Sequence, residues 1–122
     1  HKVMSFGSDD SVRGVLKATI DTNEFQRLRR ISQLGLASYV FPGATHTRFS
    51  HSLGVAFLAT FVLDYLIDLE EKNVDLSREL KKFRTSVVLS ALLHDIGHGP
   101  FSHSFEKVLK GLPNTKKFAP LH

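Results

Sequence analysis

The longest apolar stretch of the chain, Leu53 to Leu63, constrains the fold more than any other feature. Only Gly54 and Thr60 interrupt it, and Asp64 follows it. A membrane-spanning helix needs about 20 apolar residues, so we expect a buried helix and no membrane partner. This predicted helix runs from about residue 47 to 70. Its stripe at spacings of three and four consists of His51, Val55, Leu58, Val62, Leu66 and Leu69.

Three further helices are predicted from the same periodicity, over residues 22–34, 77–94 and 100–112. Thr22 is placed to cap the first, and Gly35 is placed to end it. The predicted inward faces consist of Phe25, Leu28 and Ile31, then Phe83, Val87, Ala91 and His94, then Phe101, Phe105, Val108 and Leu112. Since no two segments resemble a strand pair, the predicted fold class is all-α.

The chain of 122 residues is long enough for one domain. Residues 1–20 mix glycine, serine and short β-branched runs, which predicts a loop or a short β-hairpin. Residues 21–112 make up the helical domain, and the proline-containing residues 113–122 are expected to form an irregular tail.

Composition narrows the chemistry. The chain has no cysteine, which excludes disulfides and thiolate-bound metals and favours a cytoplasmic location. Its net charge of +4 is compatible with anionic partners. Seven histidines are present, and five of them fall in two short stretches of the sequence: His46 and His51, then His94, His98 and His103.

The predicted helix over residues 77–94 delivers His94 and Asp95 at its end. An imidazole and a carboxylate suit manganese, iron, zinc or magnesium. A charged Asp95 beside an apolar run is costly unless it is paired or metal-bound. His51, on another helix, is a third candidate ligand, and three protein ligands leave positions open for catalysis. A core histidine that is only hydrogen-bonded remains the alternative for His51.

Several motifs together resemble the HD-domain phosphohydrolase superfamily, and within it the deoxynucleoside triphosphate triphosphohydrolase branch. The bare His94-Asp95 pair is a weak signal, but the combined set is specific to that branch. The set consists of Phe25-Gln-Arg-Leu-Arg29, Gln33-Leu-Gly35, Tyr39-Val-Phe-Pro-Gly-Ala44, Arg48-Phe-Ser-His-Ser-Leu-Gly-Val55 and His94-Asp-Ile-Gly-His-Gly-Pro-Phe-Ser-His103.

The resemblance implies a partial HD-domain helical bundle and an enzyme that cleaves a dNTP into deoxynucleoside and tripolyphosphate. It implies that His51, His94 and Asp95 bind a divalent metal ion of unknown identity. The ion would polarise the α-phosphate and activate a water molecule for attack. The implied partners are a dNTP substrate and further copies of the chain in a homo-oligomer.

The resemblance also implies roles in substrate binding. Arg48 would contact the phosphates, although a solvated arginine at a helix start is the alternative. Gln33 and Leu34 would contact the sugar, where ordinary helix-end polarity and core packing are the alternatives. His98 would touch the α-phosphate.

Acid–base chemistry is implied for the region after His98. His103 would take part in proton transfer to the leaving 5′ oxygen. Glu106, one helical turn further on, would orient its imidazole. A surface pair on a helix is the alternative for these two residues.

Asp21, Gln26 and Arg29 match positions at which one branch of the family binds an effector nucleotide. The alternative is a capped, amphipathic first helix. The basic residues Arg27, Arg29 and Arg30 leave a nucleic-acid interface open, and its affinity would fall steeply with salt.

Two family features are missing. A fourth metal ligand, an aspartate far downstream, has no counterpart, and an Asp-Pro-(Val or Ile)-His-Gly motif is replaced by Asp10-Ser-Val-Arg-Gly14. We therefore expect the N-terminal part of a longer enzyme, and little activity from these residues alone. The other interpretation is a catalytically incomplete domain that senses nucleotides or assembles with partners.

Overall fold

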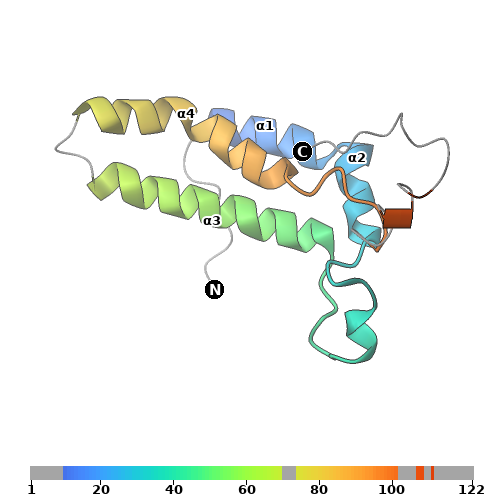
Figure 1. Cartoon of the computed structure of the whole chain (residues 1–122). Coiled ribbons are helices and arrows are strands. Elements are labelled where there is room, and N and C mark those ends of the chain that lie inside the picture. Colours follow the sequence, from blue (N-terminus) through green and yellow to red (C-terminus); the bar gives the residue numbers. More distant parts are fainter. Residues whose placement is uncertain (1–9, 70–73, 102–106, 109–110, 112–122) are drawn as a thin grey trace.

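The computed structural model describes residues 10–69, 74–101, 107–108 and 111. Its elements are α1 (Asp10–Ile20), α2 (Asn23–Gln26), the 3₁₀ turns η1 (Arg27–Arg30) and η2 (Gly35–Tyr39), α3 (Arg48–Leu69) and α4 (Val74–Leu93). Helices α3 and α4 lie antiparallel and side by side, α1 runs along α4, and α2 with η1 sits at one end of the pair (Figure 1). Within these residues the β-structure is an isolated bridge between Ser32 and Thr47, so the all-α prediction is confirmed.

The prediction of a loop or hairpin at the N-terminus is wrong for residues 10–20, which form α1. Val12 and Leu16 are four residues apart and fully buried, and Ile20 packs against the same core. One buried face at this spacing is sufficient to hold a short helix, despite Gly14 within it. Residues 1–9 and the predicted tail at 113–122 lie outside the described part of the chain.

The helix predicted over residues 22–34 is much shorter in the structure. Thr22 does cap it, because its Oγ1 accepts a hydrogen bond from the Phe25 amide at 3.3 Å. The chain then tightens into η1, and Ile31 is extended. Long-range backbone bonds replace the predicted last turns: the Arg48 amide donates to the Ile31 carbonyl at 2.9 Å, and the Gln33 amide donates to the His46 carbonyl at 3.1 Å.

Helix α3 begins where predicted, but its buried side is not the predicted one. The Ser50 amide donates to Thr47 Oγ1 at 3.3 Å, which caps the helix. Leu58 and Val62, expected in the core, are 60% and 50% exposed. The residues that α3 buries lie on a neighbouring stripe: Arg48, Phe49, Ser52, Ala56, Thr60 and Leu63.

Helix α4 differs from its prediction in the same way. Phe83 and Val87 are 51% and 42% exposed, whereas Val88 and Leu92 are fully buried. The side chain of His94, predicted to face inward, is 38% exposed. The fourth helix predicted from Pro100 stays a prediction, because residues 102–106 lie outside the described part.

Helix α3, which packs against α4, buries a stripe of small side chains. Ser52, Ala56 and Thr60 are buried at four-residue spacing, and small residues let helix axes approach. Further along, Arg84 of α4 forms three hydrogen bonds to the Asp64 carboxylate, at 2.8 to 3.1 Å. This ion pair joins the two helices.

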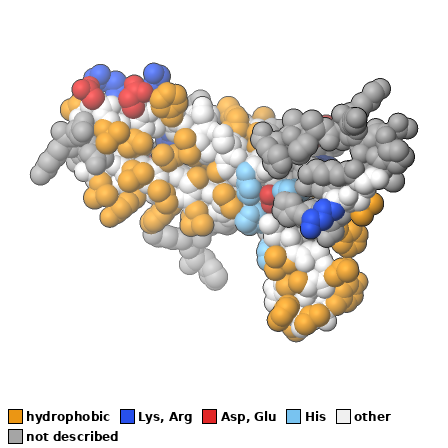
Figure 2. Space-filling model, viewed as in Figure 1, with side chains coloured by type: hydrophobic (Ala, Val, Ile, Leu, Met, Phe, Trp, Pro, Cys, Tyr) orange, Lys and Arg blue, Asp and Glu red, His pale blue; other side chains and the backbone are white. Residues whose placement is uncertain are grey.

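The outer side of the pair is apolar and exposed. Hydrophobic side chains cover the α3–α4 half of the face in Figure 2. We call the most exposed of them on α3 the apolar face: Leu58, Phe61, Val62, Tyr65 and Leu69.

Helix α3 is long and apolar enough to cross a membrane by length and composition. Its best window has a mean hydropathy of 1.7, and 22% of that window is buried. A core helix of a soluble protein meets the same criterion, so this property assigns no membrane role. The expectation that α3 is a buried helix is nevertheless wrong for most of its surface.

Candidate metal centre

Three of the predicted ligands converge at one end of the α3–α4 pair. His51 lies in the first turn of α3, and His94 and Asp95 directly follow α4. One potential ligand atom from each residue lies within 4.8 Å of the others. Histidine and acidic side chains gather at this end of the helices in Figure 2.

The spacing of these atoms suits a metal ion. His51 Nε2 and His94 Nε2 are 3.3 Å apart, and His94 Nε2 is 3.5 Å from Asp95 Oδ1. Ligands of a tetrahedral zinc ion at about 2.0–2.1 Å are separated from one another by about 3.3 Å. The donor set and its spacing therefore fit a small divalent cation.

Hydrogen bonding and burial prepare both imidazoles for this task. His94 Nδ1 lies 2.7 Å from the Ala91 carbonyl oxygen, which can only accept, so Nδ1 carries the proton and Nε2 is free to bind. Burial lowers the pKa of His51 below 6.5, against the opposing effect of the Asp95 charge. A neutral imidazole is the form that binds metal.

The two oxygens of the Asp95 carboxylate have different neighbours. Oδ2 accepts a hydrogen bond from Arg48 Nη1 at 2.6 Å, and both side chains are almost completely buried. Oδ1 faces His94 at 3.5 Å and His98 Nε2 at 3.6 Å. Arg48 thus compensates the buried charge, and Oδ1 remains directed toward His94 and His98, while His51 Nε2 lies 3.9 Å from Oδ2.

The burial of Arg48 excludes the alternative of a solvated arginine at a helix start. Its exposed fraction is 4%. The predicted contact between Arg48 and substrate phosphates stays a prediction. The sequence did not indicate the ion pair with Asp95, because the two residues are 47 positions apart.

The other residues predicted to contact substrate differ in their burial and in their distance from the histidine cluster. His98 lies beside Asp95, with its side chain 25% exposed. Gln33 is half-buried, and its Oε1 is buried with no hydrogen-bond partner among the described residues. Leu34 is 52% exposed, so core packing does not explain it. His103 and Glu106 lie outside the described residues, and their roles stay predictions.

Two of the three predicted effector-nucleotide residues are bonded to each other. Arg29 Nε donates to Gln26 Oε1 at 2.7 Å, and the Arg29 guanidinium stacks on the Phe49 ring at 3.6 Å. Asp21 is exposed. Effector binding at these residues stays a prediction.

One residue of this region was predicted only as part of a basic face. Arg27 donates through Nη1 to the His98 carbonyl at 3.0 Å and through Nη2 to the Ile96 carbonyl. A contact across about 70 positions leaves no local pattern in the sequence, although Arg27 lies inside one of the family motifs.

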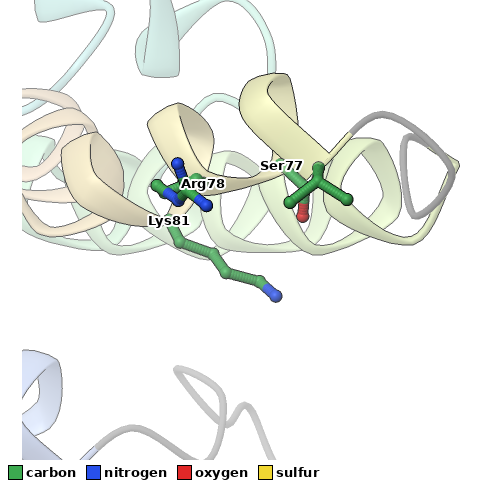
Figure 3. A pocket seen from close by; sticks show the side chains of 4 residues that line it. Ser77, Arg78 and Lys81 are labelled. Carbon is green, nitrogen blue, oxygen red and sulfur yellow. The ribbon is translucent and has the colours of Figure 1, made fainter.

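A pocket of about 380 Å³ lies near the start of α4, lined by Val74, Ser77, Arg78 and Lys81 (Figure 3). Lys81 and His94 are 13 residues apart on the chain, which is about 20 Å along a helix. Arg78 is already paired with Asp75 at 3.5 Å. The pocket is therefore separate from the histidine cluster.

The chain matches one family model and several known proteins. Residues 48–121 match the HD domain family. The chain is 49% identical over 92 residues to the deoxynucleoside triphosphate triphosphohydrolase SAMHD1 of Xenopus laevis, covering 75% of this chain and 14% of that protein. It is 44% identical over 99 residues to a SAMHD1 homolog of Dictyostelium discoideum, covering 81% of this chain and 18% of that protein.

Among solved structures, a hypothetical protein from Aquifex aeolicus superposes with a TM-score of 0.57 at 42% identity. The match covers 82% of this chain and 24% of the Aquifex chain. The present chain thus spans less than a quarter of the length of each of these three proteins. The family match over more than half of the chain, with His51, His94 and Asp95 brought together, shows that this chain belongs to the HD domain family.

Proposed function

We propose that this chain supplies the first three metal ligands of a nucleotide phosphohydrolase, which in the complete protein hydrolyses dNTPs to deoxynucleoside and tripolyphosphate. The observation that carries the proposal is the convergence of His51, His94 and Asp95 within 4.8 Å. The names of the two curated relatives, both deoxynucleoside triphosphate triphosphohydrolases, support the choice of substrate.

The ligands would be His51 Nε2, His94 Nε2 and a carboxylate oxygen of Asp95. A divalent cation, when bound, supplies Lewis-acid polarisation of a phosphoryl oxygen and lowers the pKa of water. The side chains of His51 and His94 are 34% and 38% exposed, so a polyphosphate can approach from the solvent side. Arg48 holds the Asp95 carboxylate in place and compensates its charge.

The remaining residues would bind substrate and move protons. His98 lies close enough to Asp95 for its imidazole to contact a phosphate held at the same site. His103 would give a proton to the leaving 5′ oxygen, and Glu106 would hold its imidazole in the charged form. Gln33, with a buried carbonyl oxygen that accepts no bond among the described residues, would accept one from the sugar hydroxyl.

The test is an assay of the complete parent protein with Mn²⁺ and a panel of four dNTPs. Tripolyphosphate and deoxynucleoside are the expected products, and His94→Ala should abolish their formation. The 122-residue chain should turn over little or no substrate, because the family's fourth ligand is missing from it. Metal binding without turnover of any nucleotide by the parent would instead support a sensing or assembly module.

A further inference from the structure

The loop of residues 95–98, which carries the candidate ligand Asp95, is bonded through two of its backbone carbonyls to the guanidinium of Arg27. Arg27, in the η1 turn, donates Nη1 to the His98 carbonyl at 3.0 Å and Nη2 to the Ile96 carbonyl. The two carbonyls lie on either side of Gly97. A planar guanidinium presents its donors in a fixed fork, so it sets the distance and direction of two carbonyls together.

These carbonyls are ones that need a donor. They lie three and five residues beyond Leu93, the last residue of α4, so no helical amide is placed to bond them, and a backbone carbonyl without a donor is costly unless water reaches it. The amides of the same loop are already used, since Ile96 donates to Leu93 at 2.9 Å and His98 donates to Asp95 at 3.1 Å. Backbone bonds therefore fix the amide side of the loop, and Arg27 fixes the carbonyl side.

The same short loop carries two groups of the site. Asp95 supplies a candidate ligand oxygen, and His98 Nε2 lies 3.6 Å from that oxygen. Next to Arg27 in η1, Leu28 is fully buried in the core. The fork thus ties the position of residues 95–98 to the packed interior of the domain.

We propose that Arg27 is a positioning residue for the metal centre: by holding the Ile96 and His98 carbonyls, it sets the geometry in which Asp95 and His98 face the metal and the substrate phosphate. The inference rests on the proposed function, since it assumes a metal at this cluster. It assigns to Arg27 a role different from the nucleic-acid contact that its charge alone would suggest.

The neighbouring residue Arg30 provides a matched control. It lies in the same η1 turn, is exposed, and its side chain makes no hydrogen bond or ion pair with other described residues. Removing Arg30 changes the net charge as much as removing Arg27 does, but leaves the loop bonds intact.

The experiment is a titration of Co²⁺ into the 122-residue chain, in which the visible absorption of the bound ion is measured. It compares the unsubstituted chain with Arg27→Ala, Arg27→Lys and Arg30→Ala. Outer-shell partners of metal ligands are typically worth about 10–100-fold in affinity. We expect Arg27→Ala to weaken binding by that factor and to change the Co²⁺ spectrum, and Arg30→Ala to stay within about twofold of the parent. Arg27→Lys should restore part of the affinity, because an ammonium group can bind one carbonyl but does not reproduce the fork.

Amide hydrogen exchange of the metal-free proteins provides a second readout. Exchange at Ile96 and His98 should be faster in Arg27→Ala and unchanged in Arg30→Ala. If Arg27→Ala fails to fold, Arg27→Lys provides the test. A Co²⁺ affinity and spectrum in Arg27→Lys equal to those of the unsubstituted chain would overturn the proposal.

The failures are distinguishable. If the unsubstituted 122-residue chain binds Co²⁺, and Arg27→Ala binds it with the same affinity and spectrum, the role of Arg27 is overturned but the proposed function is not. If the unsubstituted 122-residue chain binds no Co²⁺, both the proposed function and the positioning role are overturned. Salt-dependent loss of single-stranded DNA binding in Arg27→Ala, with metal affinity unchanged, would identify a nucleic-acid contact instead.

Discussion

Asp95 is the residue at which the chemistry and the stability of this domain meet. One carboxylate oxygen is bonded to Arg48 in the interior, and the other faces the imidazoles of His94 and His98. A buried carboxylate without a partner would be costly or would take up a proton. Because Arg48 supplies that partner, the second oxygen can remain available to a metal. A metal-binding Asp95 therefore requires Arg48 as its buried partner.

The pKa of His51 predicts how the metal-free chain responds to acid. Burial lowers this pKa below 6.5, so below that pH the unfolded chain binds a proton that the folded chain does not. The free energy of unfolding should therefore fall as the pH falls through about 6.5. Urea unfolding between pH 5 and 8 measures this dependence. His51→Gln should flatten it, and an equally steep profile in that variant would refute the assignment.

At the scale of the helices, the residues that α3 and α4 bury lie about one position later in the sequence than the most apolar stripe of each helix. The difference is about 100° of rotation for each helix. Ser52, Ala56 and Thr60 are buried, whereas large side chains such as Phe61 and Phe83 are exposed. Close approach of two helix axes favours small residues at the contact, and hydrophobicity alone does not reveal that preference.

Two adjacent valines test this register. Val88 is fully buried, whereas Val87 is 42% exposed. Val88→Ala should lower the free energy of unfolding by about 2 kcal/mol, because it leaves a cavity in the core. Val87→Ala should cost less than about 0.5 kcal/mol. Chemical denaturation of the two variants measures the difference, and a larger cost at Val87 would restore the register predicted from sequence.

The Asp64–Arg84 pair is predicted to stabilise the same register. The Arg84 side chain is 10% exposed and the Asp64 side chain is 46% exposed, so solvent screens part of the attraction. A double-mutant cycle with Asp64→Asn and Arg84→Met should give a coupling energy of about 1 kcal/mol. Arg78 and Asp75 form a matched exposed pair at 3.5 Å, for which we expect a coupling close to zero. Equal couplings for the two pairs would show that the α3–α4 bond does not fix the helices.

The sequence predicted these elements to different degrees, for physical reasons. Capping chemistry is local, so Thr22 and the start of α3 near Thr47 were predicted correctly. The metal cluster followed from a motif, and His51, His94 and Asp95 do converge. The Arg27 and Arg48 bonds and the extended Ile31 depend on partners far along the chain. No periodicity within one segment encodes such contacts.

At the scale of the whole molecule, this chain exposes surface that a domain core usually hides. The apolar face of α3 consists of Leu58, Phe61, Val62, Tyr65 and Leu69. Contiguous exposed apolar surface marks an interaction site or a tendency to associate. The chain also covers only 14% and 18% of two of its curated relatives, so further protein is available in such relatives to cover the equivalent face.

We expect the 122-residue chain to self-associate through the apolar face. Sedimentation velocity over a range of concentrations measures this behaviour. Replacing the exposed residues Leu58 and Phe61 with lysine should shift the chain toward monomer without loss of helical circular dichroism, since neither contributes to the buried core. A parent chain that is monomeric at all concentrations would contradict the expectation.

The measurement that tests the central claim most directly is calorimetric titration of Mn²⁺ into this chain at pH 7.5. The account predicts one site per chain, with affinity lowered at least about 10–100-fold by His94→Ala. It predicts no such change for His46→Ala, since His46 is exposed and lies outside the cluster. Absence of binding by the parent, or undiminished binding by His94→Ala, would contradict the assignment of His51, His94 and Asp95 as a metal centre.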